Sequence, residues 1–525
     1  MQGLKKNRLL LLPFLIGLAL MIWSWYLSYP LSVISSNDFV FNHISILYWF
    51  SLPLLLASMF LMAVTSKSNF LKWILSIGIV LTLFSISYFY LMMPGADSQY
   101  FRGLTEYFFK TRSLDASQLN LNYYQWPAFF LLADIVTSVS GLSLVNYEFL
   151  LYALIAFLLS SALYVYAFKK HNMNGFLAVA AFFISIAYFI NYQSVPFSLA
   201  LGLLFVLLMF EPHKKSAAST VIIIVLYVSL LISHLFVPVF FILYSLLRSL
   251  FDKNRQNRRF YRNFVVFSLV SYLVVQITIA NFSFDQVFKN ILDTPVTYSD
   301  IYLQTVGSSF SIPIDIIAQF FSRLVTITSV GLCFGGFILL LLKRKMDAID
   351  KAILITGIVY SALGFALNTL GYRAIAVVFI PISLGAAFLF KGKLKPYIGG
   401  LFLILLILFL FVPLHQSFNR EITFQTRETY VADNFFIDHY NWEKPGFVIA
   451  DFRTMAYLQS KLNHYIYIYD SWEQSGSRGD GILFTPQFAG APFGNYSSVE
   501  SLSQGERLDV VYNDGFSYVL INGGH

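Results

Sequence analysis

The chain has 525 residues, of which 57% are hydrophobic and only 12% are charged. One water-soluble core cannot bury that much apolar surface, so the composition excludes an ordinary soluble protein and indicates that lipid is the main solvent. The formal net charge is +8. Its basic residues fall in short clusters between apolar runs, as in cytoplasmic loops of membrane proteins, which argues against nucleic-acid binding. The single cysteine, Cys333, excludes an intramolecular disulfide and a thiol-based metal site.

Runs of about 20 apolar residues predict the membrane spans. Such runs cover residues 9–27, 45–64, 70–92, 147–168, 175–191, 195–210, 263–281, 323–342, 351–370, 373–390 and 397–414. The first run lacks a signal-peptide cleavage site and is predicted to be a retained helix. The run 217–250 is too long for one straight span, carries Ser233 and His234 near its middle, and has basic residues at both ends. Two helices joined by a tight outer turn would place the basic residues at both ends of this run on the inner side. With this division, the predicted number of spans is about 13.

The apolar stretch Trp126–Leu142 is ambiguous because it contains Pro127 and Asp134. If it spans the membrane, Lys169-Lys170 and every later basic cluster lie outside. If it lies in the outer interface or re-enters, all those clusters are cytoplasmic, together with the basic N-terminus. We favour the second alternative, which places the N-terminus inside.

This topology divides the chain into two parts. Residues 1–414 form a transmembrane domain with long outer loops at 93–146 and 282–322, and residues 415–525 form an extracytoplasmic domain. The apolar-polar segment Ile312–Phe321 of the second loop is expected along the interface. In the C-terminal part, the pattern of residues 447–470 predicts strand, helix and strand, and the last residues predict two short strands around Asn513-Asp514-Gly515. The expected fold class is a polytopic α-helical membrane protein with a small α/β domain.

The segment 94–115 leaves the third span on the outer side and places Asp97, Tyr100, Arg102 and Glu106 just beyond the bilayer. A carboxylate at this boundary suits an enzyme that deprotonates a water-borne acceptor while a lipid tail anchors its other substrate. Asp97 is therefore the candidate catalytic residue. The alternative is that Asp97 caps a helix beginning at the next residue.

The order of these features resembles the C-type (GT-C) integral-membrane glycosyltransferases. The shared features are a long first outer loop with an Asp just past a span, an amphipathic segment, and a Pro-led apolar stretch ending in Ser-Gly-Leu-Ser (Tyr124–Ser143). The resemblance implies polyprenyl-phosphate-linked sugar donors, an acidic active-site residue in that loop, and a juxtamembrane helix in place of a span. Here Asp97 stands alone until Glu106 and Asp115, and residues 470–474 do not match the Trp-Trp-Asp-Tyr-Gly signature of the oligosaccharyltransferase branch.

Two basic residues are candidates for holding the donor phosphate, beside Arg102. Arg373 begins a span on the outer side, where a guanidinium can pair with a lipid phosphate at headgroup depth. The resemblance supports this role, and the alternative is an Arg that binds ordinary headgroups. His234, at the turn of the helical hairpin, is expected to contact the phosphate or a sugar hydroxyl, or else to cap the turn.

The candidate acceptor cleft contains Tyr100, Glu106, Asp134 and Asp293. Asp134 is an ionisable group in an apolar setting, which makes it a functional candidate, although an interfacial helix would let it face water. Asp293 lies on the second long loop, for which a solvated loop is the simpler reading. No metal ligands are predicted. A divalent cation stays open as a cofactor, since it would need more oxygen ligands than Asp97 supplies.

The sequence thus predicts a membrane glycosyltransferase that moves a hexose or pentose from a polyprenyl-phosphate-linked donor to a glycan, lipid or protein acceptor on the outer face. No phosphate-cradling G-x-x-x-x-G-K-[ST] or G-x-G-x-x-G motif is present, which argues against a nucleotide-sugar site. The alternatives are an envelope polysaccharide polymerase or ligase, a multi-span transporter, and a non-catalytic scaffold or receptor.

Overall fold

The computed structural model describes residues 2–29, 40–89, 96–114, 121–186, 195–209, 217–280, 313–343, 346–366, 371–391, 395–418, 427–439, 448–450, 457–458, 467–468, 481–484, 508–513 and 518–522.

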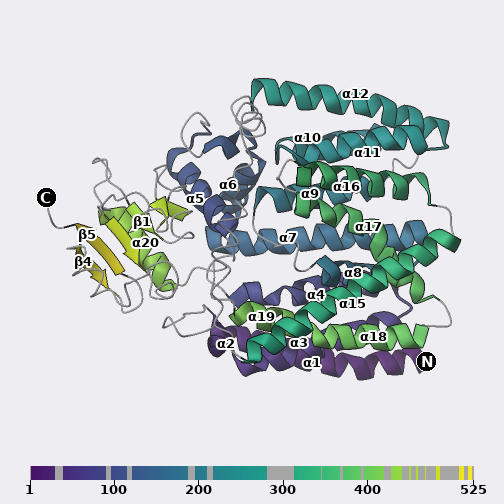
Figure 1. The fold of residues 1–525 in the computed structure, drawn as a ribbon, viewed down its shortest axis with the longest axis horizontal. Helices are drawn as coiled ribbons and strands as arrows, with labels where there is room; N and C mark the ends of the chain where they lie inside the picture. Colours follow the sequence, from purple (N-terminus) through teal and green to yellow (C-terminus); the bar gives the residue numbers. More distant parts are fainter. Residues whose placement is uncertain are drawn as a thin grey trace.

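The described residues are mostly helical, and the longer helices run back and forth as one bundle (Figure 1). The bundle helices are α1 (Gln2–Ser28), α3 (Ile46–Thr65), α4 (Asn69–Leu83), α7 (Leu144–Val165), α8 (Gly175–Ile186), α9 (Pro196–Met209), α10 (Ala217–Leu231), α11 (Val237–Phe251), α12 (Arg255–Thr278), α15 (Pro313–Lys343), α16 (Ala348–Ala366), α17 (Gly371–Leu389) and α18 (Lys395–Leu408). The other helical segments are α2 (Val40–His43), η1 (Ser85–Phe89), α5 (Ala96–Thr111), η2 (Leu121–Gln125), α6 (Ala128–Ser140), the π-helix η3 (Tyr166–Lys170), α19 (Phe411–Phe418) and α20 (Arg427–His439).

Within these ranges, six helical segments are long and apolar enough to cross a membrane, and further apolar helices are shorter. Helices α1 and α12 lie at opposite edges of the bundle (Figure 1), and only 11% and 22% of their apolar windows are buried. Large apolar side chains on a surface of this extent would be unfavourable in water, so both helices are suited to contact lipid. The fold is that of a polytopic helical membrane protein.

The basic connections gather at one end of the bundle, which we call the basic end. Lys67 follows α3, Lys169 and Lys170 lie in η3, Lys343 ends α15, and Lys391 follows α17. These helices end on the side where the chain begins (Figure 1). These lysine-bearing connections share one side of the bundle with the start of α1.

The long apolar run 217–250 is divided, as predicted from its length, into α10 and α11 with a turn at Ser233 and His234. Helix α6 occupies most of the ambiguous stretch 126–142. Its 13 residues would reach only about 20 Å, less than the roughly 30 Å of the hydrocarbon core. It also ends in Gly141, whose φ of 70° stops the helix. Unlike α8 and α9, which border residues outside the described ranges, α6 has described residues at both ends, so its short length is in keeping with the interfacial alternative.

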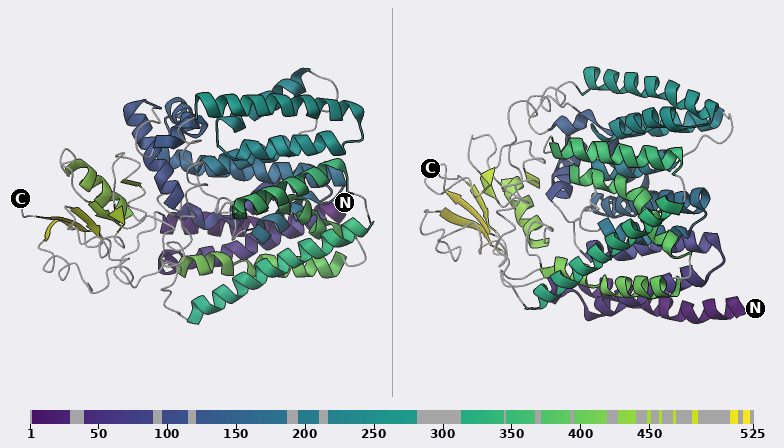
Figure 2. Two further views of the ribbon diagram at one scale, coloured as in Figure 1. Left: turned by 45° about the horizontal axis from the view of Figure 1, so that its top comes forward. Right: turned by 45° about the vertical axis from the view of Figure 1, so that its right-hand side comes forward.

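The last part of the chain contains a five-stranded sheet of order β2-β1-β3-β5-β4. Its strands are β1 (Val448–Ala450), β2 (Tyr467–Ile468), β3 (Gly481–Phe484), β4 (Leu508–Asn513) and β5 (Tyr518–Asn522). Strand β1 pairs in parallel with β2 and β3, whereas β5 pairs antiparallel with β3 and β4. The sheet lies beyond the end of the bundle that carries α5 and α6, which we call the sheet end (Figures 1 and 2).

Three elements differ from the sequence-based expectation. Helix α15 runs unbroken from Pro313, so the segment expected along the interface continues the span; proline is favoured in the first turn of a helix and nothing after it breaks the pattern. Strand β3 and helix α20 were not predicted. Strand β3 has only 4 residues, too few for a clear alternation of apolar and polar positions.

Helices α15 and α17 pack closely at two glycines. A Cβ added at Gly385 would overlap the carbonyl oxygen of Cys333, and one added at Gly336 would overlap the carbonyl oxygen of Gly385. Small residues permit this approach of two backbones, which is a common way to join helices in membranes.

Candidate active site at the sheet end

The structure places the predicted catalytic residue in a helix at the sheet end. Helix α5 begins at Ala96, so Asp97 lies within its first turn instead of preceding it. Arg373 lies in the first turn of α17. The side chains of Asp97 and Arg373, and the whole of Asp293, lie outside the described residues.

Helix α5 is held in place by the burial of its apolar face and by a hydrogen bond from a tyrosine side chain to its backbone. Phe101, Leu104 and Phe108 are buried at intervals of three and four residues, which is the period of one helix face. The hydroxyl of Tyr124, in η2, donates to the carbonyl oxygen of Leu104 at 2.6 Å. Burial raises the pKa of the Tyr124 phenol, so this hydroxyl stays protonated as a donor. Tyr100 is half-buried and its ring packs edge-on against Phe101.

Arg102 is the centre of a buried ion network. Its Nε lies 3.1 Å from Glu106 Oε1, one turn along α5, and its Nη1 lies 3.4 Å from Glu148 Oε2 in the first turns of α7. The side chains of Arg102 and Glu148 are 3% and 6% exposed. The hydroxyl of Tyr457, from the C-terminal part of the chain, donates to Glu106 Oε2 at 2.8 Å. The network therefore joins three segments that are remote in sequence.

This pairing limits what Arg102 can bind. Buried charges are tolerated when they are paired and hydrogen-bonded, and Arg102 faces two carboxylates. The Arg102 charge also acts on Tyr29, which directly follows α1. Burial raises the pKa of the Tyr29 phenol, and the Arg102 guanidinium opposes part of that rise. The geometry favours a positioning role for Arg102, which holds α5 against α7.

A hollow of ≈ 400 Å³ opens between α5, α6 and the start of α7. We call it the α5–α6 hollow; its lining residues are Glu106, Phe109, Arg112, Asp134, Thr137, Ser138, Leu142 and Leu144. Arg112 Nη1 forms an ion pair with Asp134 Oδ1 across it. Ser138 Oγ also lies 3.4 Å from the same oxygen. Two predicted cleft residues, Glu106 and Asp134, thus line one space.

His234 lies in the turn between α10 and α11, also at the sheet end. It is buried, its ring packs edge-on against Phe197 at 5.4 Å, and its Nδ1 accepts from the backbone N–H of Phe236 at 3.2 Å. This bond assigns the ring proton of neutral His234 to Nε2. The carbonyl oxygen of Ile232 accepts from the backbone N–H of Ala128 at 3.1 Å, which ties the turn to the start of α6.

Sequence reasoning missed Glu148, Tyr457 and Arg112. Glu148 sits inside an apolar run, where a lone carboxylate is unusual enough to be noticed. Tyr457 and Arg112 carry no such signal. Among the described residues, no three His, Cys, Asp or Glu side chains are placed to hold a metal ion.

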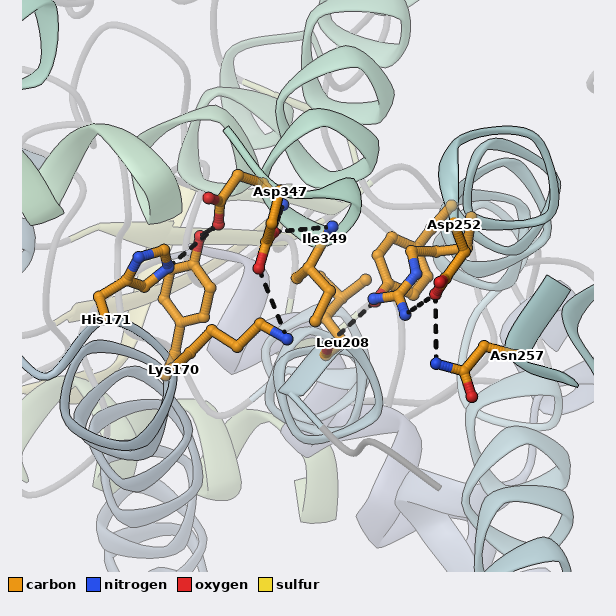
Figure 3. Close-up of polar contacts among 11 residues, drawn as sticks. Lys170, His171, Leu208, Asp252, Asn257, Asp347 and Ile349 are labelled. Atoms are coloured by element: carbon orange, nitrogen blue, oxygen red, sulfur yellow. Dashed lines mark hydrogen bonds and ion pairs between the residues drawn. The ribbon is translucent and has the colours of Figure 1, made fainter. Parts of the chain in front are cut away.

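A separate set of polar contacts lies at the basic end (Figure 3). Asp350 Oδ1 lies 3.1 Å from His171 Nε2 and accepts from the hydroxyl of Tyr166, while Lys170 pairs with Asp347 at 3.5 Å. The nearby Arg248 pairs with Asp252 at 2.6 Å. These contacts connect the ends of helices.

Comparison with known proteins gives little guidance. No protein-family model and no curated protein matches the chain. Among solved structures, the crystal structure of ArnT from Cupriavidus metallidurans in the apo state is similar over 86% of this chain and 97% of that chain, with 12% identity and a TM-score of 0.47. A similarity at this level does not establish a shared activity.

Proposed function

We propose that the protein is a GT-C-like membrane glycosyltransferase, which moves a sugar from a polyprenyl-phosphate-linked donor to a glycan, lipid or protein acceptor on the outer face of the membrane. One observation carries the proposal: Asp97 lies in the first turn of α5, at the end of the bundle opposite the basic end. Cationic connections favour the cytoplasmic side, so Asp97 and the sheet are assigned to the outer side.

In the proposed reaction, the Asp97 carboxylate accepts the proton of an acceptor hydroxyl or amide. The acceptor atom then bonds to the anomeric carbon, and the bond from that carbon to the phosphate oxygen breaks with its electron pair on the departing lipid phosphate. General-base catalysis of this kind contributes about 10²–10⁴-fold to the rate. The absence of a nucleotide-binding motif in the sequence favours a lipid-linked donor.

Arg373 and His234 are proposed to stabilise the departing phosphate. Arg373 is in the first turn of α17, where a guanidinium and the free backbone N–H groups of a helix N-terminus both favour an anion. Neutral His234 carries its proton on Nε2, which is a suitable donor to a phosphate oxygen. Arg102 is proposed to position α5 and not to bind the phosphate directly, because Glu106 and Glu148 already compensate its charge.

The test is transfer of radiolabelled sugar from a panel of polyprenyl-phosphate sugars, in membranes that contain the wild-type protein or a variant at equal levels. Asp97→Asn should abolish transfer, whereas the control Asp438→Asn, at an exposed acid on α20, should leave it unchanged. If Asp97→Asn is tolerated and Arg373→Ala is not, a polysaccharide polymerase or ligase replaces the proposal. If no donor is consumed with membrane extracts as acceptors, the transferase proposal is wrong and a transporter becomes the leading alternative.

A further inference from the structure

The chemistry of the α5–α6 hollow points to a particular kind of ligand. Its charged lining residues are Glu106, Asp134 and Arg112, and the guanidinium of Arg112 is already paired with Asp134. The lining has a formal net charge of −1, and its one cation is engaged by Asp134 while Glu106 is engaged by Arg102, so no uncommitted cation faces the space and a polyanionic head group is disfavoured. Sugar hydroxyls and amines donate hydrogen bonds, and carboxylates accept them strongly.

The backbone at Arg112 indicates that its side chain has a use in the hollow. Arg112 has a φ of 54° directly after α5, the left-handed position at which glycine usually ends a helix. A residue with a Cβ costs roughly 1–2 kcal/mol in this conformation. The side chain pairs with Asp134 and lies over the Phe109 ring at 5.7 Å. These contacts hold both charged groups at the wall of the hollow. Backbone strain such as the positive φ of Arg112 is frequent in ligand sites.

The position of the hollow on α6 indicates that the ligand arrives from the membrane. Asp134, Thr137 and Ser138 face the hollow, while Ile135 and Val139, on the adjoining stripe of the same helix, are 60% and 85% exposed. An interfacial helix buries such an apolar stripe in the boundary between head groups and acyl chains. The hollow therefore opens beside a lipid-contacting surface, and its apolar residues continue that surface inward.

We propose that the α5–α6 hollow binds the head group of a membrane-anchored glycolipid, with a neutral or amino-bearing sugar facing Asp134 and Glu106. That this glycolipid is the acceptor of the transfer reaction rests on the proposed function; the binding itself does not. The lipid tail would leave past Leu142 and Leu144 toward the stripe formed by Ile135 and Val139.

The test uses ligand protection of a cysteine placed in the hollow. The native Cys333 is fully buried, so it gives little background reaction. Ser138→Cys provides a thiol that lines the hollow, and Val139→Cys provides a matched thiol one residue away that does not line it. The full chain in phospholipid nanodiscs is labelled with a maleimide in the presence of hexyl glucoside, galactoside or mannoside, or of hexyl phosphate, 1-hexanol or free glucose.

At least one hexyl glycoside should slow labelling at the Ser138→Cys site by 1 + [L]/Kd, about elevenfold at ten times its Kd, and leave the Val139→Cys site unchanged. Asp134→Asn should remove that protection. Equal protection by 1-hexanol would mean that only the tail binds, and equal protection by hexyl phosphate would mean an anion site. Either result, or the absence of protection by all glycosides, overturns the proposal. Protection without any sugar transfer would keep the binding site and reject the proposed function.

Discussion

The hydrogen bond from Tyr457 to Glu106 makes a quantitative prediction about the stability of α5. The bond is 2.8 Å long and its acceptor belongs to a carboxylate that is paired with Arg102. A hydrogen bond to a charged group contributes about 1.5–3 kcal/mol. Because the Glu106 side chain is 18% exposed, water can replace part of the lost bond, and we expect roughly 1–2 kcal/mol for Tyr457→Phe.

The measurement is amide hydrogen exchange of the peptide that contains α5, in the nanodisc-embedded protein. A loss of about 1–2 kcal/mol should speed exchange roughly 5–30-fold when local opening limits it. The control is Tyr164→Phe, which removes a comparable hydroxyl that donates to the carbonyl oxygen of Asn69 at 2.7 Å, near the basic end. It should leave exchange in α5 unchanged.

A double-mutant cycle then separates this bond from general damage. On a Glu106→Gln background, Tyr457→Phe should cost clearly less, because the charged acceptor is gone. Exchange in α5 that is the same in Tyr457→Phe as in wild type would refute the reasoning. So would an equal change in the Tyr164→Phe control, since that result would place the effect on the whole bundle.

Three further substitutions test the packing that holds the site. Arg102→Ala leaves buried carboxylates without their cation and should destabilise the protein by about 3–5 kcal/mol, measured as a fall in thermal stability in detergent. Gly385→Ala forces α15 and α17 apart and should lower the melting temperature by several degrees, whereas Gly335→Ala, with open space around its Cβ, should leave it unchanged or raise it. Arg248→Lys removes a guanidinium that stacks on aromatic rings and pairs with a carboxylate, and should cost about 1–3 kcal/mol by the same assay.

Much of the bundle could be predicted because its signals are local. A run of apolar residues long enough to cross a bilayer is visible without knowing its neighbours, and the division of 217–250 followed from its length and its flanking charges. The amphipathic spacing of α5 was equally readable. The continuous start of α15 was missed because residues 312–321 mix apolar and polar positions, and composition alone does not distinguish a span extension from an interfacial segment.

The pairing within the candidate site could not be predicted, because it joins distant residues. Arg102 and Glu148 are 46 positions apart, and Tyr457 and Glu106 are 351 apart. Periodicity reports which face of a helix is buried, not which partner lies opposite a charge. Arg102 therefore looked like a candidate phosphate ligand in the sequence, whereas its surroundings give it two carboxylate partners. The roles of Asp97 and Arg373 stay predictions.

The contact between Tyr457 and Glu106 also bears on topology, independently of the charges. Both residues must lie on the same side of the membrane to form a hydrogen bond, so the chain crosses an even number of times between them. Among the described residues, ten bundle helices lie between α5 and Tyr457, from α7 to α18, which is an even number of crossings if each of them crosses and α6 does not. A crossing α6 would add one to this number and make it odd. The hydrogen bond between Tyr457 and Glu106 and the clustering of lysines at the basic end therefore agree with the same arrangement, in which α6 does not cross and α5 lies on the side of Tyr457.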